Sequence, residues 1–279
     1  MLRSTLLAGA ALVLPGVGGA TPMDVEQELI VKTSVSDSAS QKSATASCPS
    51  GKRPVGTGAK VTPASAWGKV ALLRITPEAA TNSVTADGVE VSGTSSLWSV
   101  TAYAICAKSF DSYQVVQGQS PFDVTSTKAA TAQCGSKLLG AGGHPAIAGA
   151  AGKVALTGIF PWTDHKSALA SGAKTQTSTT SWVVNSYAIC GDFGPSLGYW
   201  YEDGSSNSSS PKSITRSCPA GTVLIGAGGK VNTTASGKVA LASIEPSSDL
   251  KSVTVTGAEI AGGTSSNWSV TAWAICHNP

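Results

Sequence analysis

The sequence contains few charged residues, few aromatic residues and little histidine. Charged residues make up 13% and aromatic residues 6% of the 279 residues, and the formal net charge is +3. A chain this close to neutrality lacks the basic footprint of a protein that binds nucleic acid or an anionic membrane surface. The only histidines are His144, His165 and His277, so imidazole chemistry has few candidates. We therefore expect no nucleic-acid partner.

Long hydrophobic runs are absent except for one short run at the N-terminus. Residues 1–5 carry one positive charge, residues 6–17 are apolar, and residues 18–20 are small. This order is typical of a removable signal peptide. A membrane anchor is the alternative, but the run is shorter than the ~20 residues needed to cross a bilayer. We therefore expect residues 1–20 to be cleaved and the mature protein to be secreted, without a membrane span.

Small and β-branched residues dominate the rest of the chain. Glycine alone accounts for 31 residues, and serine, threonine, alanine and valine are also abundant. β-branched residues favour pleated surfaces, whereas glycine and serine favour turns. The composition therefore predicts an all-β protein with few helices.

Six cysteines reveal an internal repeat. They are separated by 58, 28, 56, 28 and 58 residues, and this alternation indicates three copies of a module of roughly 84 residues. Each copy has a lysine six residues before its first cysteine, then a glycine-rich run, the pentapeptide Gly-Lys-Val-Ala-Leu, an Ile-x-Pro tripeptide and a closing segment that ends in its second cysteine. The lysines are Lys42, Lys128 and Lys212, the pentapeptides begin at Gly68, Gly152 and Gly237, and the closing segments begin at Trp98, Trp182 and Trp268.

The copies account for the whole mature chain, with predicted boundaries at 24–109, 110–194 and 195–279. We expect about six strands in each copy. In the closing strand of the first copy, alternate residues from Trp98 to Cys106 share an apolar face. Ser99, Thr101 and Tyr103 share the other face, which should be wetter. The strands predicted in the first copy cover residues 28–35, 42–48, 53–61, 68–76, 83–91 and 98–106.

An even number of cysteines in an exported chain predicts disulfide bonds. The repeat allows two schemes, one with a bond inside each copy and one with bonds between successive copies around a closed ring. We favour the first scheme because it applies one rule three times. A zinc site is disfavoured, since no two cysteines have the C-x-x-C spacing. The favoured bonds are Cys48–Cys106, Cys134–Cys190 and Cys218–Cys276, and the alternative bonds are Cys106–Cys134, Cys190–Cys218 and Cys48–Cys276.

No catalytic site is predicted. The chain has no Gly-x-Ser-x-Gly elbow, no histidine recurs in all copies, and no other polar constellation recurs either. Glu90 and Glu259 are equivalent, but Lys174 replaces them in the middle copy. The glycine runs are followed by strands instead of helices, which favours β-bulges or close backbone approaches over phosphate binding. We therefore expect no enzyme, no catalytic residue, no metal and no cofactor.

Candidate binding residues lie where the copies differ, because a repeated scaffold commonly carries specificity on its variable segments. The middle copy has Trp162, Asp164 and His165 in a segment that is not aromatic in the other copies, and the third copy has Trp200 and Tyr201 beside two acids. Aromatic faces beside acids and amides stack on sugar rings, and Trp and Tyr also anchor protein interfaces. These five residues are the predicted binding site. The alternative is that the tyrosines of the third copy only fill a strand.

The combination of Cys-Pro-x-Gly, the glycine run, Gly-Lys-Val-Ala-Leu and Trp-Ser-Val-Thr-Ala-Tyr-Ala-Ile-Cys resembles repeats of exported microbial proteins of uncharacterised role. The resemblance covers all three copies and implies secretion and β structure, without an activity. For the architecture we expect three equivalent modules around a pseudo-threefold axis, prism-like, in a closed ring that removes exposed edge strands. A six-bladed propeller and three tandem sandwiches are the alternatives.

These features predict a secreted binding protein with lectin-like recognition of a cell-surface or extracellular glycan, in which repeated weak sites gain through avidity. The alternative is a structural or adaptor protein that binds another protein in a secreted assembly, and a hydrolase is the third and weakest interpretation. Asn-x-Ser/Thr sequons at Asn207, Asn232 and Asn267 matter for glycosylation only in a eukaryotic host.

Overall fold

β-strands form almost all of the structure, as the composition predicts. The computed structural model describes residues 27–108, 112–149, 152–193, 197–260 and 262–278. In these ranges the chain forms eighteen strands and one short 3-10 turn, Ala64–Ala66. None of the described helical structure is long and apolar enough to cross a membrane. The predicted signal peptide, residues 1–20, lies outside the described residues.

Each copy contributes six strands, and those of the first copy begin and end within two residues of the predicted positions. The first copy forms β1 (Glu28–Thr33), β2 (Gln41–Ser47), β3 (Lys52–Thr62), β4 (Val70–Glu78), β5 (Ser83–Glu90) and β6 (Ser99–Lys108). The second forms β7 (Gln114–Gln119), β8 (Thr127–Gln133), β9 (Lys137–Ile147), β10 (Val154–Pro161), β11 (Ser167–Lys174) and β12 (Trp182–Gly191). The third forms β13 (Leu197–Asp203), β14 (Lys212–Ser217), β15 (Val223–Thr233), β16 (Val239–Pro246), β17 (Ser252–Glu259) and β18 (Trp268–His277).

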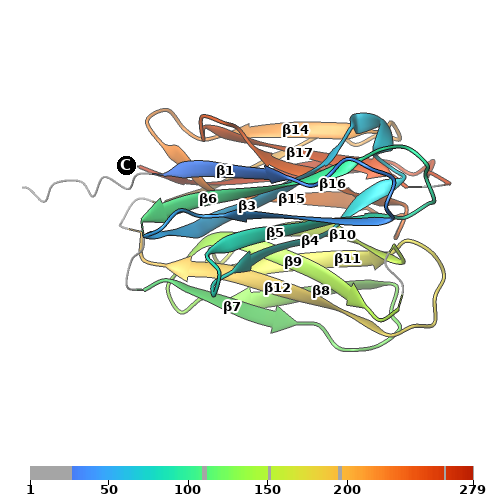
Figure 1. Cartoon of the computed structure of the whole chain (residues 1–279), viewed down its shortest axis with the longest axis horizontal. Coiled ribbons are helices and arrows are strands. Elements are labelled where there is room, and N and C mark those ends of the chain that lie inside the picture. Colours follow the sequence, from blue (N-terminus) through green and yellow to red (C-terminus); the bar gives the residue numbers. More distant parts are fainter. Residues whose placement is uncertain (1–26, 109–111, 150–151, 194–196, 261, 279) are drawn as a thin grey trace, which may run out of the picture.

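Every copy divides its strands between two sheets, and every sheet is shared by two copies (Figure 1). We name the three six-stranded antiparallel sheets by the copies that form them. The 1–3 sheet has the order β1-β6-β3-β16-β17-β14, the 2–3 sheet has the order β13-β18-β15-β10-β11-β8, and the 1–2 sheet has the order β2-β5-β4-β9-β12-β7. Copy 1 therefore joins copy 3, copy 3 joins copy 2, and copy 2 joins copy 1, which closes a ring.

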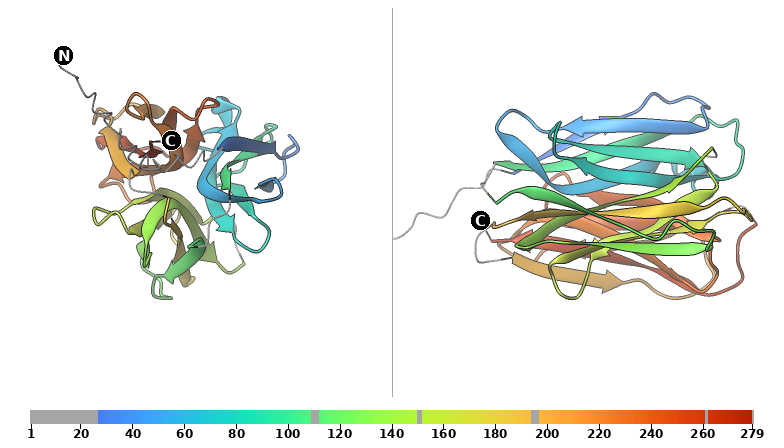
Figure 2. Two further views of the ribbon diagram at one scale, coloured as in Figure 1. Left: turned by 90° about the vertical axis from the view of Figure 1, so that its left-hand side faces the viewer. Right: turned by 90° about the horizontal axis from the view of Figure 1, so that it is seen from below.

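Three lobes surround a common centre, and each lobe carries the colours of one copy (left view of Figure 2). A lobe is a sandwich of two three-stranded half-sheets that face each other, such as β1-β6-β3 and β2-β5-β4 in copy 1. The predicted pseudo-threefold, prism-like arrangement of three modules is thus confirmed. Because the sheets are shared between copies, the molecule is neither a propeller of four-stranded blades nor a row of independent sandwiches.

Glycines bring the three copies together at the centre. A Cβ atom on Gly56, Gly140 or Gly226 would lie 2.2, 2.3 or 2.1 Å from a backbone carbonyl oxygen of another copy. The register of the strand pairs also shifts beside each of these glycines, which marks a β-bulge. The predicted role of the glycine runs, a bulge or a close backbone approach, is therefore confirmed at these positions.

The disulfide bonds cross-link the two sheets of each lobe. The pairs are Cys48–Cys106, Cys134–Cys190 and Cys218–Cys276, with Cα–Cα distances of 5.7, 5.5 and 5.8 Å. The within-copy scheme is confirmed, and the scheme with bonds between copies is excluded. Three disulfide bonds are consistent with an extracellular protein.

The expectation of a wetter face on the closing strand is wrong for the first copy. Ser99, Thr101 and Tyr103 on β6 are only 6, 6 and 8% exposed. We call the sheet face that points away from the interior of a lobe the outer face. On the outer face of the 1–3 sheet, side chains of neighbouring strands shield these residues from solvent. The Thr101 hydroxyl meets that of Thr33 at 2.9 Å, and the Tyr103 hydroxyl donates to Glu245 of copy 3 at 3.2 Å.

The expectation that ring closure removes edge strands is also wrong. Each sheet ends in two edge strands, because the copies pair at the centre of the molecule and not at its rim. The pairing between copies is short, and in the 1–3 sheet it involves Ser243 with Lys60 and Ile244 with Ala59. The half-sheets therefore separate towards the rim, where the edge strands are β1 and β14, β13 and β8, and β2 and β7.

Candidate functional site

The outer faces of the three shared sheets have equivalent positions that carry different side chains. In the 1–3 sheet the residues around the pairing between copies are Lys60, Tyr103 and Glu245. The Lys60 ammonium lies 2.9 Å from a carboxylate oxygen of Glu245, and the Tyr103 hydroxyl donates to the same carboxylate. Burial, followed by the charge of Glu245, raises the pKa of Tyr103. The charges of Lys60 and Glu245 are therefore paired with each other.

In the 1–2 sheet the position of Lys60 is taken by His144, and that of Tyr103 by Tyr187. Arg74 of copy 1 lies nearby and pairs with Asp87, with its Nε atom 2.7 Å from a carboxylate oxygen. Burial, followed by the positive charge of Arg74, lowers the pKa of His144. This face therefore holds an ion pair of its own, and protonation of its histidine is disfavoured.

In the 2–3 sheet two of the three equivalent positions are aromatic and carry larger or new rings. Trp273 on β18 replaces the tyrosine, and Phe160 on β10 replaces the glutamate of the 1–3 sheet. The two rings stack, with centroids 4.7 Å apart and an angle of 20° between their planes. Trp273 lies opposite Gly228, which has no side chain, so the indole can cross β15 to reach Phe160. Lys230 lies beside them, with its ammonium 5.5 Å from the centroid of Phe160.

A pocket of about 400 Å³ opens on this face between copies 2 and 3. Trp162, just after β10, and Tyr201, on β13, stand on its opposite sides, separated by β18 and β15. Their side chains are among the most exposed aromatic groups of the described residues, at 46 and 62%. The pocket is lined by Phe160, Pro161, Trp162, Thr163, His165, Tyr199, Tyr201, Asp203, Lys230, Asn232, Thr271 and Trp273.

The turn between β10 and β11 holds one wall of the pocket. The Asp164 carboxylate accepts hydrogen bonds from the backbone N–H groups of Lys166 and Ser167 at 2.9 and 2.8 Å. The Ser167 hydroxyl also donates to this carboxylate at 2.6 Å, and although burial acts to raise it, this bond and the two backbone bonds keep the pKa of Asp164 below its ordinary value. His165 has a φ of +56° and stacks on Tyr199 with ring centroids 4.3 Å apart. The turn therefore packs against β13 through the stacked rings of His165 and Tyr199.

The structure brings three of the five predicted binding residues to this pocket, namely Trp162, His165 and Tyr201, although they come from two copies. Asp164 does not line the pocket and acts on it through the turn. Trp200 points to the other side of β13, where its ring lies 5.6 Å from the guanidinium of Arg216.

Trp200 holds a position that has an apolar counterpart in each of the other two copies. It pairs with Ala274, as Ile30 pairs with Ala104 and Val116 with Ala188 in the other copies. The large ring thus occupies the equivalent of these apolar positions at the edge of the lobe, where Trp200 is 41% exposed and lies outside the pocket.

Several residues of the pocket were not predicted from the sequence. Trp273 lies in the closing segment, which its repetition marks as scaffold, and Lys230 belongs to the glycine run. The available signal was that Trp273 stands where the other copies have tyrosine. Phe160, Tyr199 and Asp203 lie in the variable segments but were not among the five predicted residues, and the other residues outside the predicted set are Lys230, Asn232, Thr271 and Trp273.

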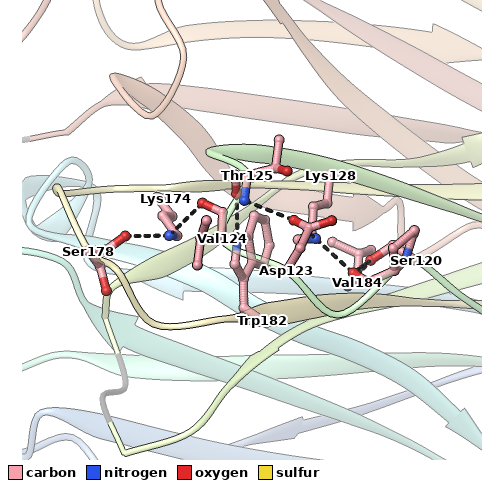
Figure 3. A network of polar contacts seen from close by, with 10 residues as sticks. Ser120, Asp123, Val124, Thr125, Lys128, Lys174, Ser178, Trp182 and Val184 are labelled. Atoms are coloured by element: carbon pink, nitrogen blue, oxygen red, sulfur yellow. Dashed lines mark hydrogen bonds and ion pairs between the residues drawn. The ribbon is translucent and has the colours of Figure 1, made fainter.

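A polar constellation does recur in the three copies, contrary to the expectation from the sequence. In copy 2 the Lys128 ammonium lies 5.7 Å from the centroid of the Trp182 ring, pairs with Asp123, and donates to the carbonyl of Pro121 at 2.7 Å (Figure 3). The Trp182 indole N–H donates to the carbonyl of Thr125 at 2.6 Å. The equivalent groups are Lys42 with Asp37 and Trp98, and Lys212 with Asn207 and Trp268.

This constellation holds the loop before the second strand of each copy against the lobe. Figure 3 shows that Lys174 adds to it in copy 2, with hydrogen bonds from its ammonium to the carbonyls of Val124 and Ser178. The hydrogen bond from Lys128 lowers the pKa of Asp123. Because the charged atoms are engaged with each other and with the backbone, we assign the constellation to the scaffold.

Comparison with protein-family models and with curated proteins gave no match. In the described part of the chain, no group of three or more His, Cys, Asp or Glu residues is placed to hold a metal ion. The aromatic pocket of the 2–3 sheet is therefore the basis on which a function is assigned.

Alkaline pH is expected to destabilise the fold through tyrosines that join the copies. The Tyr113 hydroxyl donates to the carbonyl of Pro54, and the Tyr199 hydroxyl to that of Leu138, at 3.0 and 2.7 Å. Burial raises the pKa of each phenol to about 12, above its ordinary value of about 10. Since the folded state holds these protons more tightly, their contribution is complete below about pH 10 and is lost as the pH rises through 12.

The denaturation midpoint should therefore stay level up to about pH 10 and then fall, as measured by urea unfolding at a series of pH values. A Tyr113→Phe/Tyr199→Phe variant should show a shallower fall, because the titrating phenols are gone. An equally steep fall in this variant would show that other groups control the alkaline limit.

Proposed function

We propose that this is a secreted, lectin-like binding protein that recognises a cell-surface or extracellular glycan in the pocket of the 2–3 sheet. The observation that carries the proposal is the pair of exposed rings, Trp162 and Tyr201, on opposite sides of a pocket with a polar floor. Sugar rings present apolar C–H faces and a rim of hydroxyls, and aromatic side chains with a polar end suit such ligands. The disulfide-linked lobes support the extracellular location.

The floor of the pocket offers hydrogen-bonding groups that are already oriented. The Asn232 amide donates to the hydroxyl of Thr271 at 2.7 Å, and the Thr271 hydroxyl donates in turn to the carboxylate of Asp203. These two hydrogen bonds leave the amide oxygen of Asn232 and one carboxylate oxygen of Asp203 as acceptors for sugar hydroxyls. A preoriented floor reduces the entropy lost when a ligand binds. The pocket therefore combines stacking surfaces with directional contacts.

Trp162→Ala and Tyr201→Ala are each expected to weaken glycan binding by roughly tenfold or more, because a buried aromatic anchor commonly contributes over 1 kcal/mol. The ligand would first be identified on a glycan array, and affinities would then be measured by titration calorimetry. Trp200→Ala is the matched control, since Trp200 is exposed to a similar extent but lies outside the pocket, and its affinity should match that of the wild type.

The control separates a role in binding from a role in folding, and thermal unfolding of all three variants would show that each is folded. If the wild-type protein binds no glycan on the array, the lectin proposal is wrong, and an adaptor that binds protein becomes the better assignment. Equal loss of affinity in Trp162→Ala and Trp200→Ala would show that the aromatic pocket is not the glycan-binding site.

A further inference from the structure

The 2–3 sheet differs from the 1–3 sheet in carrying a lysine that forms no ion pair among the described residues. In the 1–3 sheet, the ammonium of Lys60 is paired with Glu245 at 2.9 Å. Lys230 is the equivalent lysine of the 2–3 sheet, but the position of Glu245 is occupied by Phe160. Among the described residues Lys230 forms no ion pair, and its ammonium lies 5.5 Å from the centroid of Phe160. Because Phe160 stands where the 1–3 sheet has Glu245, the Lys230 ammonium lines the aromatic pocket without a carboxylate at that position.

Among the described residues that line the aromatic pocket, Asp203 is the only carboxylate, and it forms no ion pair with Lys230. Asp203 lies opposite Thr271 on β18, and Thr271 lies opposite Lys230 on β15. Two strand spacings therefore separate the two charged residues, or about 10 Å. Asp203 is already bonded to the Thr271 hydroxyl, so its charge is directed to that group.

A second pocket of about 300 Å³ lies on the same sheet, and Lys230 lines both pockets. The second pocket extends over β15, β10, β11 and β8, whereas the aromatic pocket extends over β13, β18, β15 and β10. Lys128 also lines the second pocket, but its charge is paired with Asp123. The hydroxyl groups of the second pocket are those of Thr127, Thr157, Ser171, Thr233 and Ser236.

We propose that the ligand is an anionic glycan, and that a carboxylate on one of its sugars binds the Lys230 ammonium where the two pockets meet. A neighbouring sugar then stacks against Trp162 and Tyr201, and the chain continues over the hydroxyl groups of the second pocket. This inference rests on the proposed glycan-binding function and adds the charge of the ligand, its extent and the residue that selects it. A sulfate ester would provide the same charge as a carboxylate.

Three probes separate these possibilities: a tetragalacturonate, its fully methyl-esterified form and a sulfated oligosaccharide of similar length. The first two differ in charge and share a backbone, so calorimetry on this pair measures the contribution of the carboxylates. We expect the acid to bind at least about tenfold more tightly than the ester, which corresponds to about 1.4 kcal/mol. Its affinity should fall as salt is added, because an exposed ion pair is screened.

Lys230→Met should remove the preference for the acid over the ester and also the salt dependence of binding. Lys60→Met is the matched control, because Lys60 holds the equivalent position on a sheet where the charge is already paired, and its binding should equal that of the wild type. Circular dichroism and thermal unfolding would show that both variants are folded. Tighter binding of the sulfated probe than of the acid would overturn the carboxylate assignment.

The inference and the proposed function fail in different ways. If acid and ester bind equally and Lys230→Met changes neither affinity, the anionic ligand is wrong and the glycan-binding function stands. If no glycan on an array that contains neutral and acidic members binds the wild-type protein, the glycan-binding function itself is wrong.

Discussion

Gly226→Ala is expected to destabilise the whole molecule by about 3 kcal/mol or more, because it forces apart the three copies at the central axis. The added methyl carbon would lie 2.1 Å from the carbonyl oxygen of Leu139 and 3.0 Å from the Cδ1 atom of Ile275. Extra carbon atoms in a packed core typically cost 1–3 kcal/mol, and here the obstacle is backbone, which cannot rotate away. We therefore expect a large fall in the midpoint of urea or thermal unfolding.

Gly93→Ala is the matched control for the axis. A Cβ atom at Gly93 would have no neighbour within 4 Å, and its backbone lies outside the left-handed region, so the variant should unfold within about 0.5 kcal/mol of the wild type. Similar unfolding midpoints for Gly226→Ala and Gly93→Ala would show that the copies do not meet at the axis in the way described.

Removal of the middle disulfide is expected to have the second large effect. In a Cys134→Ala/Cys190→Ala variant the unfolded chain regains the freedom of a loop with a sequence separation of 56 residues. The chain-entropy model assigns about 4 kcal/mol to a loop of this length. Both sulfur-bearing residues are buried in the hydrophobic core, so the variant also loses packing. We expect the loss to weaken glycan binding indirectly, since the second lobe carries Trp162.

Guanidinium unfolding of the wild-type protein and the variant, each with and without reductant, would measure this contribution. The variant should be less stable than the oxidised wild type, and reductant should narrow the difference. Equal stability of the two proteins under oxidising conditions would mean that the bond does not constrain the unfolded chain. The Cys48–Cys106 and Cys218–Cys276 bonds remain in the variant under oxidising conditions, so the difference in stability measured there is that of the middle bond alone.

The strands and disulfide bonds were predictable because the threefold repeat fixes them three times over. The sharing of sheets was not predictable, since in the 1–2 sheet the pairing between copies involves a single register pair, Ile75 with Gly143. Such a short contact leaves no periodic pattern in the sequence. The burial of Tyr103 follows from the same sharing, because the residue that it contacts, Glu245, belongs to another copy.

The candidate pocket was partly predictable because its walls lie where the copies differ. Trp162 and Tyr201 could be identified in this way, although nothing in the sequence placed them in one pocket. Trp200 could not be separated from Tyr201, because successive residues of a strand point to opposite faces and the orientation of an isolated edge strand is unknown. The role of Lys230 emerges only when Phe160, from another copy, is known to lie beside it.

The sharing of each sheet by two copies has a consequence for how such a molecule can arise. A single module supplies only halves of two sheets, so identical modules on separate chains would associate as a cyclic homotrimer. In a homotrimer the three grooves between subunits are necessarily identical. Covalent fusion into one chain removes this restriction, since each groove draws its residues from a different pair of copies. Here one groove holds a Lys60–Glu245 ion pair, while another has Phe160 in place of the glutamate, and its Lys230 forms no ion pair among the described residues.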